Sequence, residues 1–196
     1  MTQPLILAST STSRKALLTN AGVRFTTLPS GVDEAALKSG FSGPPEALAL
    51  TLAIAKAASV SRLHPQALVI GGDQLLVCDS QIYDKPHDHE AAAAQLRALA
   101  GRTHALITSV CLVENGQTLW SHTASAHLTM RPVSDAFLAG YLAAEGDELL
   151  HCVGAYRLEA LGAQLFERIE GDYFTVLGLP LLALLAALRA RHVLTA

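Results

Sequence analysis

The sequence predicts an α/β fold in which helices flank a mixed β-sheet. Short runs rich in Val, Ile and Leu, such as residues 68–77, are typical of buried strands. Helical patterns separate the first of these runs, which favours parallel neighbours. Two longer strand candidates are joined by Asn115 and Gly116, a pair that favours a tight antiparallel hairpin. A hairpin that interrupts alternating strands and helices indicates a sheet with both parallel and antiparallel pairs. We expect this sheet and its helices to form one domain that spans residues 1–196.

Composition excludes several classes of protein. The 196 residues are 51% hydrophobic and 16% charged, which argues against a disordered chain, and the net charge of -3 leaves no basic surface for a nucleic acid. Cys78, Cys111 and Cys152 are scattered and odd in number, which favours reduced thiols in a cytoplasmic protein. Residues 1–4 carry no basic group and residues 5–8 are too short for the apolar region of a signal peptide, so we do not expect a signal peptide; the longest apolar run, residues 179–188, is too short to span a bilayer. We therefore expect a cytoplasmic protein with neither a nucleic-acid nor a membrane partner.

Local patterns predict the elements of the first half of the chain. Apolar runs indicate strands, and leucine and alanine at helical spacing indicate helices. Pro45 suits the first position of a helix, and Gly22 suits a helix end. In chain order we expect a strand at residues 4–8, a helix at 14–22, a strand at 23–28, a polar loop at 29–44 and a helix at 45–62.

The second half begins with the most apolar strand candidate. Gly71 and Gly72 are expected to end this strand just before Asp73. Asp88 and Ser134 suit the N-caps of two helices. The remaining predicted elements are extended segments at 75–78 and 81–83, a helix at 89–100, strands at 103–113 and 118–130, a helix at 134–145, a strand at 164–169 and a leucine-rich helix after Pro180.

Asp73 is the first candidate for a functional site. A carboxylate at the end of a buried strand is costly unless a cation, a metal ion or hydrogen-bond donors meet it, so Asp73 needs partners. Lys85 follows shortly, and Lys56 is the sole charge between Glu46 and Arg62. An isolated Asp more often caps its own loop, and an isolated Lys more often extends to solvent. Pattern alone leaves both interpretations open.

A second candidate is the run of small hydroxyl residues before the first helix. Residues 9–13 are all Ser or Thr, and Arg14 follows them in the first turn. Hydroxyls, free helix amides and an arginine form a plausible anion site. Ordinary capping by Ser11 or Ser13 explains only part of the run, so a cap and a phosphate site both stay open.

The motifs that are missing narrow the chemistry. The chain contains no P-loop, dinucleotide fingerprint, G-x-S-x-G or H-E-x-x-H motif. His87 and His89 lack a nearby third ligand, so a transition-metal site is not favoured. The remaining hydroxyls, basic groups and acids suit hydrolysis of a phosphate ester, in which a divalent cation and basic side chains hold the phosphates and a carboxylate takes a proton.

An ordered series of short motifs covers nearly the whole chain. They are Leu7-Ala8-Ser9-x-Ser11-x-x-Arg14-x-x-Leu17-Leu18, Val32-Asp33-Glu34, Ala55-Lys56-Ala57, Ile70-Gly71-x-Asp73-Gln74, Lys85-Pro86, Leu96-x-x-Leu99-x-Gly101-x-x-His104, Gly154-Ala155-Tyr156 and Val176-x-Gly178-Leu179-Pro180. Each is weak alone, and the ordered set is specific. The sequence resembles the Maf family of nucleoside triphosphate pyrophosphatases.

This resemblance implies an elongated α/β fold with two lobes around a central nucleotide-binding cleft, in a homodimer. It implies a divalent cation, Mg²⁺ or alternatively Mn²⁺, and cleavage of a nucleoside triphosphate between the α and β phosphates. The products would be a nucleoside monophosphate and pyrophosphate, in a role that clears unwanted nucleotides.

The resemblance also assigns roles to residues. Asp73 would accept the proton of the attacking water, and Asp73 and Glu34 would hold the metal. The residues implied to bind the triphosphate are Ser9, Ser11, Arg14, Lys56 and Lys85, and those implied to read the base are Gln74 and Glu159.

Substrate choice is divided between two branches of this family. Gln74 after Asp73, the stretches at 150–154 and 165–168, and Glu159 resemble the branch that acts on 7-methyl-GTP rather than dTTP and UTP. A glutamate suits guanine, which offers N1–H and N2–H donors. Ser13, however, stands where the branches carry Trp or Arg. We therefore expect a broader nucleoside triphosphate pyrophosphatase that leans toward purine or methylated guanine.

Two alternatives belong to other classes. A non-catalytic nucleotide-binding regulator of cell division or septum formation would bind nucleotides without turnover. A general phosphatase would release orthophosphate rather than pyrophosphate.

Overall fold

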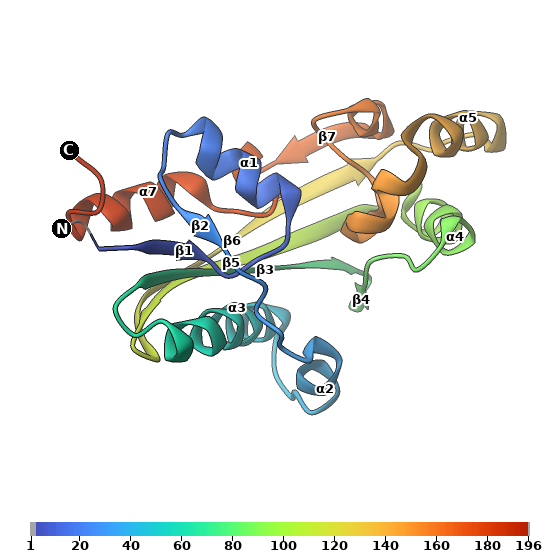
Figure 1. Cartoon of the computed structure of the whole chain (residues 1–196). Coiled ribbons are helices and arrows are strands. Elements are labelled where there is room, and N and C mark those ends of the chain that lie inside the picture. Colours follow the sequence, from blue (N-terminus) through green and yellow to red (C-terminus); the bar gives the residue numbers. More distant parts are fainter. Residues whose placement is uncertain (1–2, 196) are drawn as a thin grey trace. The chain divides into compact units, whose positions relative to one another are not determined.

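A mixed β-sheet is the framework of the computed structural model, which describes residues 3–195 (Figure 1). Its seven strands within those residues follow the order β2-β1-β3-β5-β6-β7, and β4 also pairs with β3. The α/β class and the mixed sheet are therefore confirmed. The chain divides into two compact units, which agrees with the expected two lobes. The first unit contains the chain up to Gln74, Thr108–Ala124 and the chain from Gly178; the second contains Leu75–Ile107 and Ser125–Leu177.

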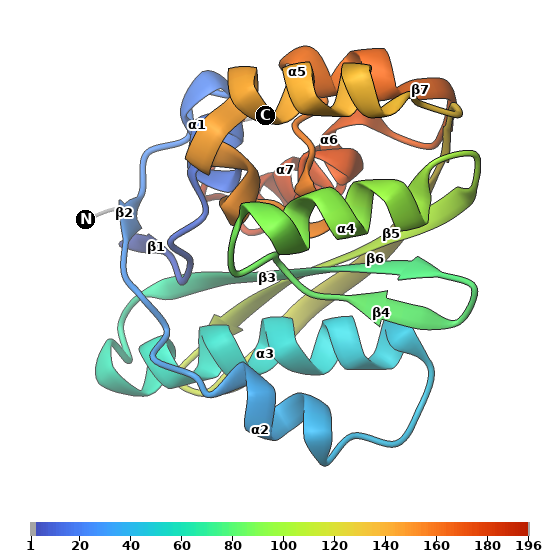
Figure 2. The ribbon, with the colours of Figure 1, turned by 90° about the vertical axis from the view of Figure 1, so that its right-hand side faces the viewer.

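The first unit surrounds the start of β3 with helices. Its elements are β1 (Leu5–Leu7), α1 (Thr12–Asn20), β2 (Thr26–Thr27), α2 (Glu34–Ser39), α3 (Pro45–Leu63), α7 (Leu181–Ala190) and parts of β3 (Leu68–Cys78), β5 (Thr103–Glu114) and β6 (Gln117–Met130). β1 pairs in parallel with both β2 and β3. Figures 1 and 2 show α3 on one side of β3 and α1 and α7 on the other.

The second unit contains the rest of β3, β5 and β6. Its own elements are β4 (Gln81–Tyr83), α4 (His89–Leu99), α5 (Asp135–Glu145), β7 (Phe166–Glu170), α6 (Tyr173–Val176) and three short 3₁₀ helices (Gly146–His151, Val153–Ala155 and Leu161–Leu165). β4 pairs antiparallel with β3, and β7 pairs antiparallel with β6. Helix α4 packs against α5 and the first two 3₁₀ helices.

Most predicted caps and turns are confirmed because they depend on neighbouring residues alone. The side chains of Ser11, Asp88 and Ser134 each accept a backbone N–H of the first turn of α1, α4 and α5. Asn115 and Gly116 have φ of 45° and 75°, as the hairpin between β5 and β6 requires. Among residues 3–195, no helix has the length and apolar character needed to cross a bilayer.

The prediction that Gly71 and Gly72 end the central strand is wrong. β3 runs from Leu68 to Cys78, so Asp73 lies inside the strand. A Cβ on Gly71 would lie 2.7 Å from the Ala57 Cβ and closer still to the Ala53 carbonyl oxygen. Glycine is therefore present at position 71 because α3 packs directly on the β3 backbone, and not because the strand stops.

Two further predictions in the first unit are corrected. The stretch at 29–44 is not all loop, because Asp33 accepts the Ala36 N–H and caps α2. Helix α2 buries none of its residues, so it has no apolar pattern to reveal it. The strand predicted at 23–28 is reduced to Thr26–Thr27, because its partner β1 is itself only three residues long.

The core of the second unit contains a buried histidine. His104 Nε2 lies 2.7 Å from the Tyr156 hydroxyl, and both side chains are buried. Burial lowers the pKa of His104 from 6.5 to about 4, because the charged imidazolium would lose its hydration. His104 is therefore neutral at physiological pH, although it would be protonated in an unfolded chain below pH 6.5.

We expect Gly71→Ala to lower the free energy of unfolding by about 2 kcal/mol or more, because the new methyl group overlaps the α3 backbone. Urea unfolding measures this change. The control is Gly140→Ala on α5, where a Cβ meets nothing within 4 Å. That change should stabilise by about 0.5–1 kcal/mol through helix propensity. Equal stability of Gly71→Ala and the unaltered chain would contradict the close packing of α3 on β3.

A second prediction concerns pH. Because the folded pKa of His104 is depressed, the unfolded chain binds more protons between about pH 6.5 and pH 4, and stability falls as pH falls through that window. His104→Gln can still bond to Tyr156 and cannot titrate. From pH 7 to pH 5, urea unfolding should therefore show a loss that is about 2 kcal/mol larger in the unaltered chain than in His104→Gln. If the free energy of unfolding changed equally with pH in the unaltered chain and in His104→Gln, His104 would not be held neutral.

Candidate active site

Asp73 lies at the centre of an ion cluster in the first unit. Its Oδ1 is 2.6 Å from the Nζ of Lys56, and the same nitrogen is 2.8 Å from the Oε1 of Glu34. The side chains of Asp73 and Lys56 are 6% and 11% exposed, whereas that of Glu34 is 43% exposed. We call Glu34, Lys56 and Asp73 the carboxylate–lysine cluster. One ammonium thus joins a buried acid and a partly exposed acid.

The packing of α3 on β3 explains this cluster. Residues two apart on a strand share a face, so Asp73 points to the same side as Gly71, where α3 lies. Lys56 stands one position before Ala57, which touches Gly71, and therefore reaches Asp73. Helix α2 begins at Glu34 and places this acid beside the same ammonium. Asp73 is thus paired with Lys56, whereas Lys85 belongs to the second unit.

The burial of Asp73 changes its acidity. Desolvation raises its pKa above the ordinary value of 3.8, and Glu34 contributes in the same direction. The positive charges of Lys56 and Arg14 act against this shift without cancelling it. A carboxylate with a raised pKa is a stronger proton acceptor than an exposed one.

Arg14 lies on the other side of β3. Its Nε donates to the Gly178 carbonyl oxygen at 2.7 Å, and its Nη1 donates to the Ser9 Oγ at 3.4 Å. A Cβ on Gly72 would be 3.3 Å from the Arg14 Nε, so the guanidinium lies directly over this glycine. Burial lowers the pKa of Arg14, and the charge of Asp73 opposes this shift, so the two groups are close enough to interact electrostatically.

The hydroxyl-rich turn before α1 holds Arg14 in place. Ser11 accepts the Arg14 N–H and is the cap that one interpretation of the sequence expected. Ser9 accepts the Ser11 N–H at 3.1 Å as well as a bond from the guanidinium. β1 pairs with β3 only as far as Ile70, so this turn follows the carboxyl end of β1, where α/β sheets commonly bind ligands.

Gln74 shares the side of β3 that faces Arg14. Its Nε2 donates to the Thr108 Oγ1 at 2.9 Å. Its Oε1 would be 3.6 Å from a Cβ on Gly178, so the glycine lies between the amide and Arg14. Gly178 has a φ of +95°, which favours glycine as well. Sequence reasoning missed Thr108, since a Thr in a strand carries no signal of such a role.

Lys85 and Glu159 lie in the second unit, where both are exposed. Burial raises the pKa of the Cys152 thiol to about 11, and this shift is increased by Glu159 and opposed by Lys85. Both side chains are therefore near Cys152. All three cysteines are free, and Cys152 is held as an unreactive thiol.

A buried acid that sequence reasoning missed orders the segment around Glu159. Glu145 accepts a bond of 2.7 Å from the Arg157 Nε and another of 3.0 Å from the Leu161 N–H. The hydroxyl of Tyr141 donates to the Ala155 carbonyl oxygen in the same segment. The available signal was the position of Glu145, one helical turn after Tyr141 on the buried side of α5.

The carboxylate–lysine cluster fits a hard divalent cation. Carboxylate oxygens are its preferred ligands, and Glu34 and Asp73 already share one cationic group. The described residues contain no group of three or more His, Cys, Asp or Glu side chains arranged for a metal ion. Two carboxylates are what Mg²⁺ commonly takes from a protein when phosphate oxygens supply further ligands. His87 lies apart from this cluster, with its Nε2 3.1 Å from the Asp88 Oδ2.

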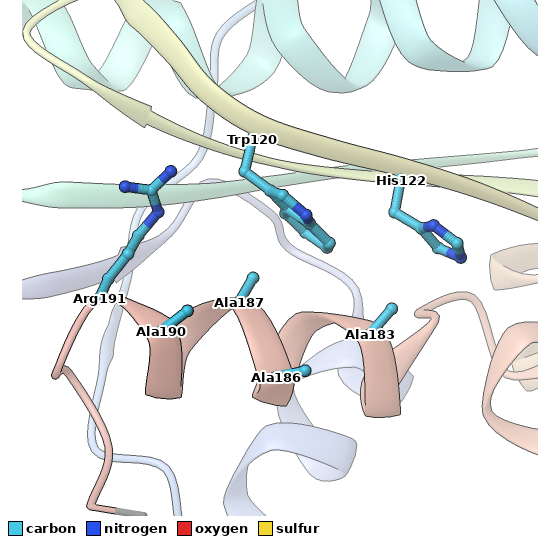
Figure 3. Close-up of a pocket in the computed structure, with 7 residues that line it drawn as sticks. All are labelled: Trp120, His122, Ala183, Ala186, Ala187, Ala190 and Arg191. Carbon is cyan, nitrogen blue, oxygen red and sulfur yellow. The ribbon is translucent and has the colours of Figure 1, made fainter.

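A separate groove in the first unit has a different character. It has a volume of about 540 Å³ and lies between β6 and α7, lined by Trp120, His122, Ala183, Ala186, Ala187, Ala190 and Arg191 (Figure 3). No residue predicted for the site lines it. Its one guanidinium, on Arg191, donates to the Leu119 carbonyl oxygen at 2.8 Å. An apolar groove of this kind does not suit a polyphosphate.

Comparisons with known proteins agree along nearly the whole chain. The profile of the family described as Maf-like protein matches residues 4–191. A protein of Brucella abortus named 7-methyl-GTP pyrophosphatase is 49% identical over 192 residues, which cover 96% of each chain. One of Rhizobium meliloti with the same name is 50% identical over 94% of each chain. A nucleoside triphosphate pyrophosphatase of Rhodopseudomonas palustris is 48% identical, over 98% of this chain and 96% of its own.

Proposed function

Because this chain belongs to the Maf-like protein family, we propose that it is a nucleoside triphosphate pyrophosphatase. It hydrolyses the phosphoanhydride between the α and β phosphates and releases a nucleoside monophosphate and pyrophosphate. The observation that carries this proposal is the buried Asp73, whose pKa is raised and whose partner is the Lys56 ammonium. This enzyme has a housekeeping role in the nucleotide pool.

Asp73 is the general base in this mechanism. It accepts a proton from water as the water oxygen bonds to a phosphorus atom, the α–β bridging bond breaks and pyrophosphate leaves. Asp73 suits this task because its carboxylate is held in one place by β3 and by the Lys56 ammonium.

Basic groups hold the triphosphate and offset its charge. Arg14 and Lys56 lie within electrostatic reach of Asp73, and the hydroxyls of Ser9 and Ser11 follow the carboxyl end of β1. We add Lys85 of the second unit to this set because Lys85-Pro86 is one of the motifs that the chain shares with the family. Arginine and lysine are the usual partners of phosphate oxygens.

A divalent cation is the expected cofactor. Glu34 and Asp73 would hold it, and its chemistry when bound is to neutralise phosphate charge and lower the pKa of a water molecule. We propose Mg²⁺, with Mn²⁺ as the alternative, because the cluster offers oxygen ligands alone.

The expected substrate is a purine or methylated guanine nucleotide, within a broad range. The names of the relatives divide between 7-methyl-GTP and nucleoside triphosphates in general. Glu159 is exposed, and its carboxylate can accept both the N1–H and the N2–H of guanine. Gln74 is the second residue assigned to the base.

We propose that the enzyme acts as a homodimer in the cytoplasm. The free thiols of the chain support a reducing compartment. The proposal of a homodimer is based on the resemblance to the family alone. A non-catalytic regulator of cell division is less favoured, because the related proteins carry the names of enzymes.

Release of pyrophosphate from a panel of 7-methyl-GTP, GTP, dTTP and UTP with Mg²⁺ tests the proposal. We expect Asp73→Asn to lower kcat by about 100-fold or more, because the proton acceptor is lost. Circular dichroism should show that the fold is retained. The control is Asp135→Asn, which removes the same charge from an acid that is 89% exposed on α5 and should keep full activity.

Other outcomes separate the alternatives. Unchanged turnover of a verified substrate by Asp73→Asn would refute the assigned base. Orthophosphate as the first product would favour a general phosphatase. No turnover of any nucleotide in the panel would favour a binding protein.

Base recognition gives a further prediction. Glu159→Gln should lower kcat/KM for 7-methyl-GTP about tenfold relative to UTP, because the amide offers one acceptor and a mismatched donor to the guanine edge. Glu90→Gln, a matched change of an exposed acid on α4, should leave this ratio unchanged. An identical substrate profile for Glu159→Gln would remove Glu159 from base recognition.

A further inference from the structure

The ammonium of Lys56 occupies the position that a cation shared by Glu34 and Asp73 would need. Its nitrogen lies 2.6 Å from one carboxylate oxygen and 2.8 Å from the other. A metal ion that bridges the same two oxygens would lie about 2.0–2.1 Å from each. Two cations bound to the same two oxygens would lie close together and repel each other. Lys56 and a divalent cation therefore compete for one site.

Moving the ammonium away is costly without a new partner. Lys56 is 8% exposed, so its charge is largely removed from water. A buried charge that loses its counter-ion is strongly unfavourable. A metal ion that arrives alone takes both carboxylates from Lys56 and offers no acceptor in return. A metal ion that arrives with a polyphosphate also brings phosphate oxygens, which can accept the three N–H groups of the lysine.

The exposed side of the cluster allows this exchange. Glu34 is the most exposed of the three side chains, and it stands on α2, a six-residue helix that buries none of its residues. Helix α2 can therefore adjust without disturbing the core. Asp73, in contrast, is fixed within β3.

We propose that Lys56 holds Glu34 and Asp73 together and excludes free divalent cations from them until a polyphosphate takes over its ammonium. This deepens the proposed function, on which it rests for the polyphosphate. The ammonium makes metal binding and triphosphate binding depend on each other, so each ligand strengthens the other. Lys56 then acts twice, first as a counter-ion to the acids and next as a counter-ion to the phosphates.

The test measures Mn²⁺ binding without any nucleotide, by the electron paramagnetic resonance signal of the free ion. Lys56→Met should bind Mn²⁺ about tenfold more tightly than the unaltered chain, because a competing charge has been removed from the acids. Lys56→Arg keeps the charge and should bind Mn²⁺ as weakly as the unaltered chain does. Lys15→Met, the same change at an exposed lysine of α1, controls for the net charge.

The opposite result has a clear meaning. If Lys56 served only to brace the two acids, Lys56→Met would bind Mn²⁺ more weakly, and that outcome would overturn the proposal. Lys56→Gln, whose amide can still donate to Asp73, gives the same comparison if Lys56→Met fails to fold. Thermal unfolding with and without Mn²⁺ gives a second readout, in which the ion should raise the melting temperature of Lys56→Gln more than that of the unaltered chain.

This experiment can fail independently of the proposed function. Tighter Mn²⁺ binding by Lys56→Met in a chain that hydrolyses no nucleotide would support the competition and refute the enzyme. Pyrophosphate release by the unaltered chain together with unimproved Mn²⁺ binding by Lys56→Met would support the enzyme and refute the competition.

Discussion

A lysine ammonium held between two carboxylates is the interaction on which the rest of the site depends. Asp73 and Lys56 are both buried, and each would be costly in that place without the other. Their pairing requires α3 to lie directly on β3, and Gly71 makes that approach possible because it has no side chain. The chemistry of the site therefore depends on the close packing of the alanine-rich helix α3 against Gly71 of β3.

The same constraint places Arg14 and Gln74. Because side chains alternate along a strand, Asp73 meets Lys56 on the α3 side of β3, whereas Gly72 and Gln74 face Arg14 and Gly178. The two sides of β3 interact electrostatically, since the positive charge of Arg14 acts to lower the pKa of Asp73, opposite to the effect of burial. β3 thus separates a group that can hold a cation and move a proton from a group that can bind anions.

Local signals were enough to predict the caps, the hairpin at Asn115 and Gly116 and the class of the fold. They failed where a distant partner decides the outcome. A glycine pair within an apolar run is typical both of a strand end and of close packing, and only α3 decides between them at Gly71. Helix α2 has no buried face, so no periodicity could reveal it. The ordered motifs singled out Lys56 and Glu34, which the structure brings together with Asp73, whereas pattern alone left the place of Lys56 open. Thr108 acts through a contact that its local sequence does not encode, whereas Glu145 could have been found from its place on the buried side of α5.

A crystal structure with Mn²⁺ and the α,β-methylene analogue of 7-methyl-GTP tests the central claim most directly, because this analogue cannot be cleaved at the bond in question. The account predicts an anomalous peak for Mn²⁺ at the Glu34 and Asp73 oxygens, with the Lys56 Nζ moved onto a phosphate oxygen. An analogue bound in the groove between β6 and α7, with Lys56 still joined to both acids, would contradict it.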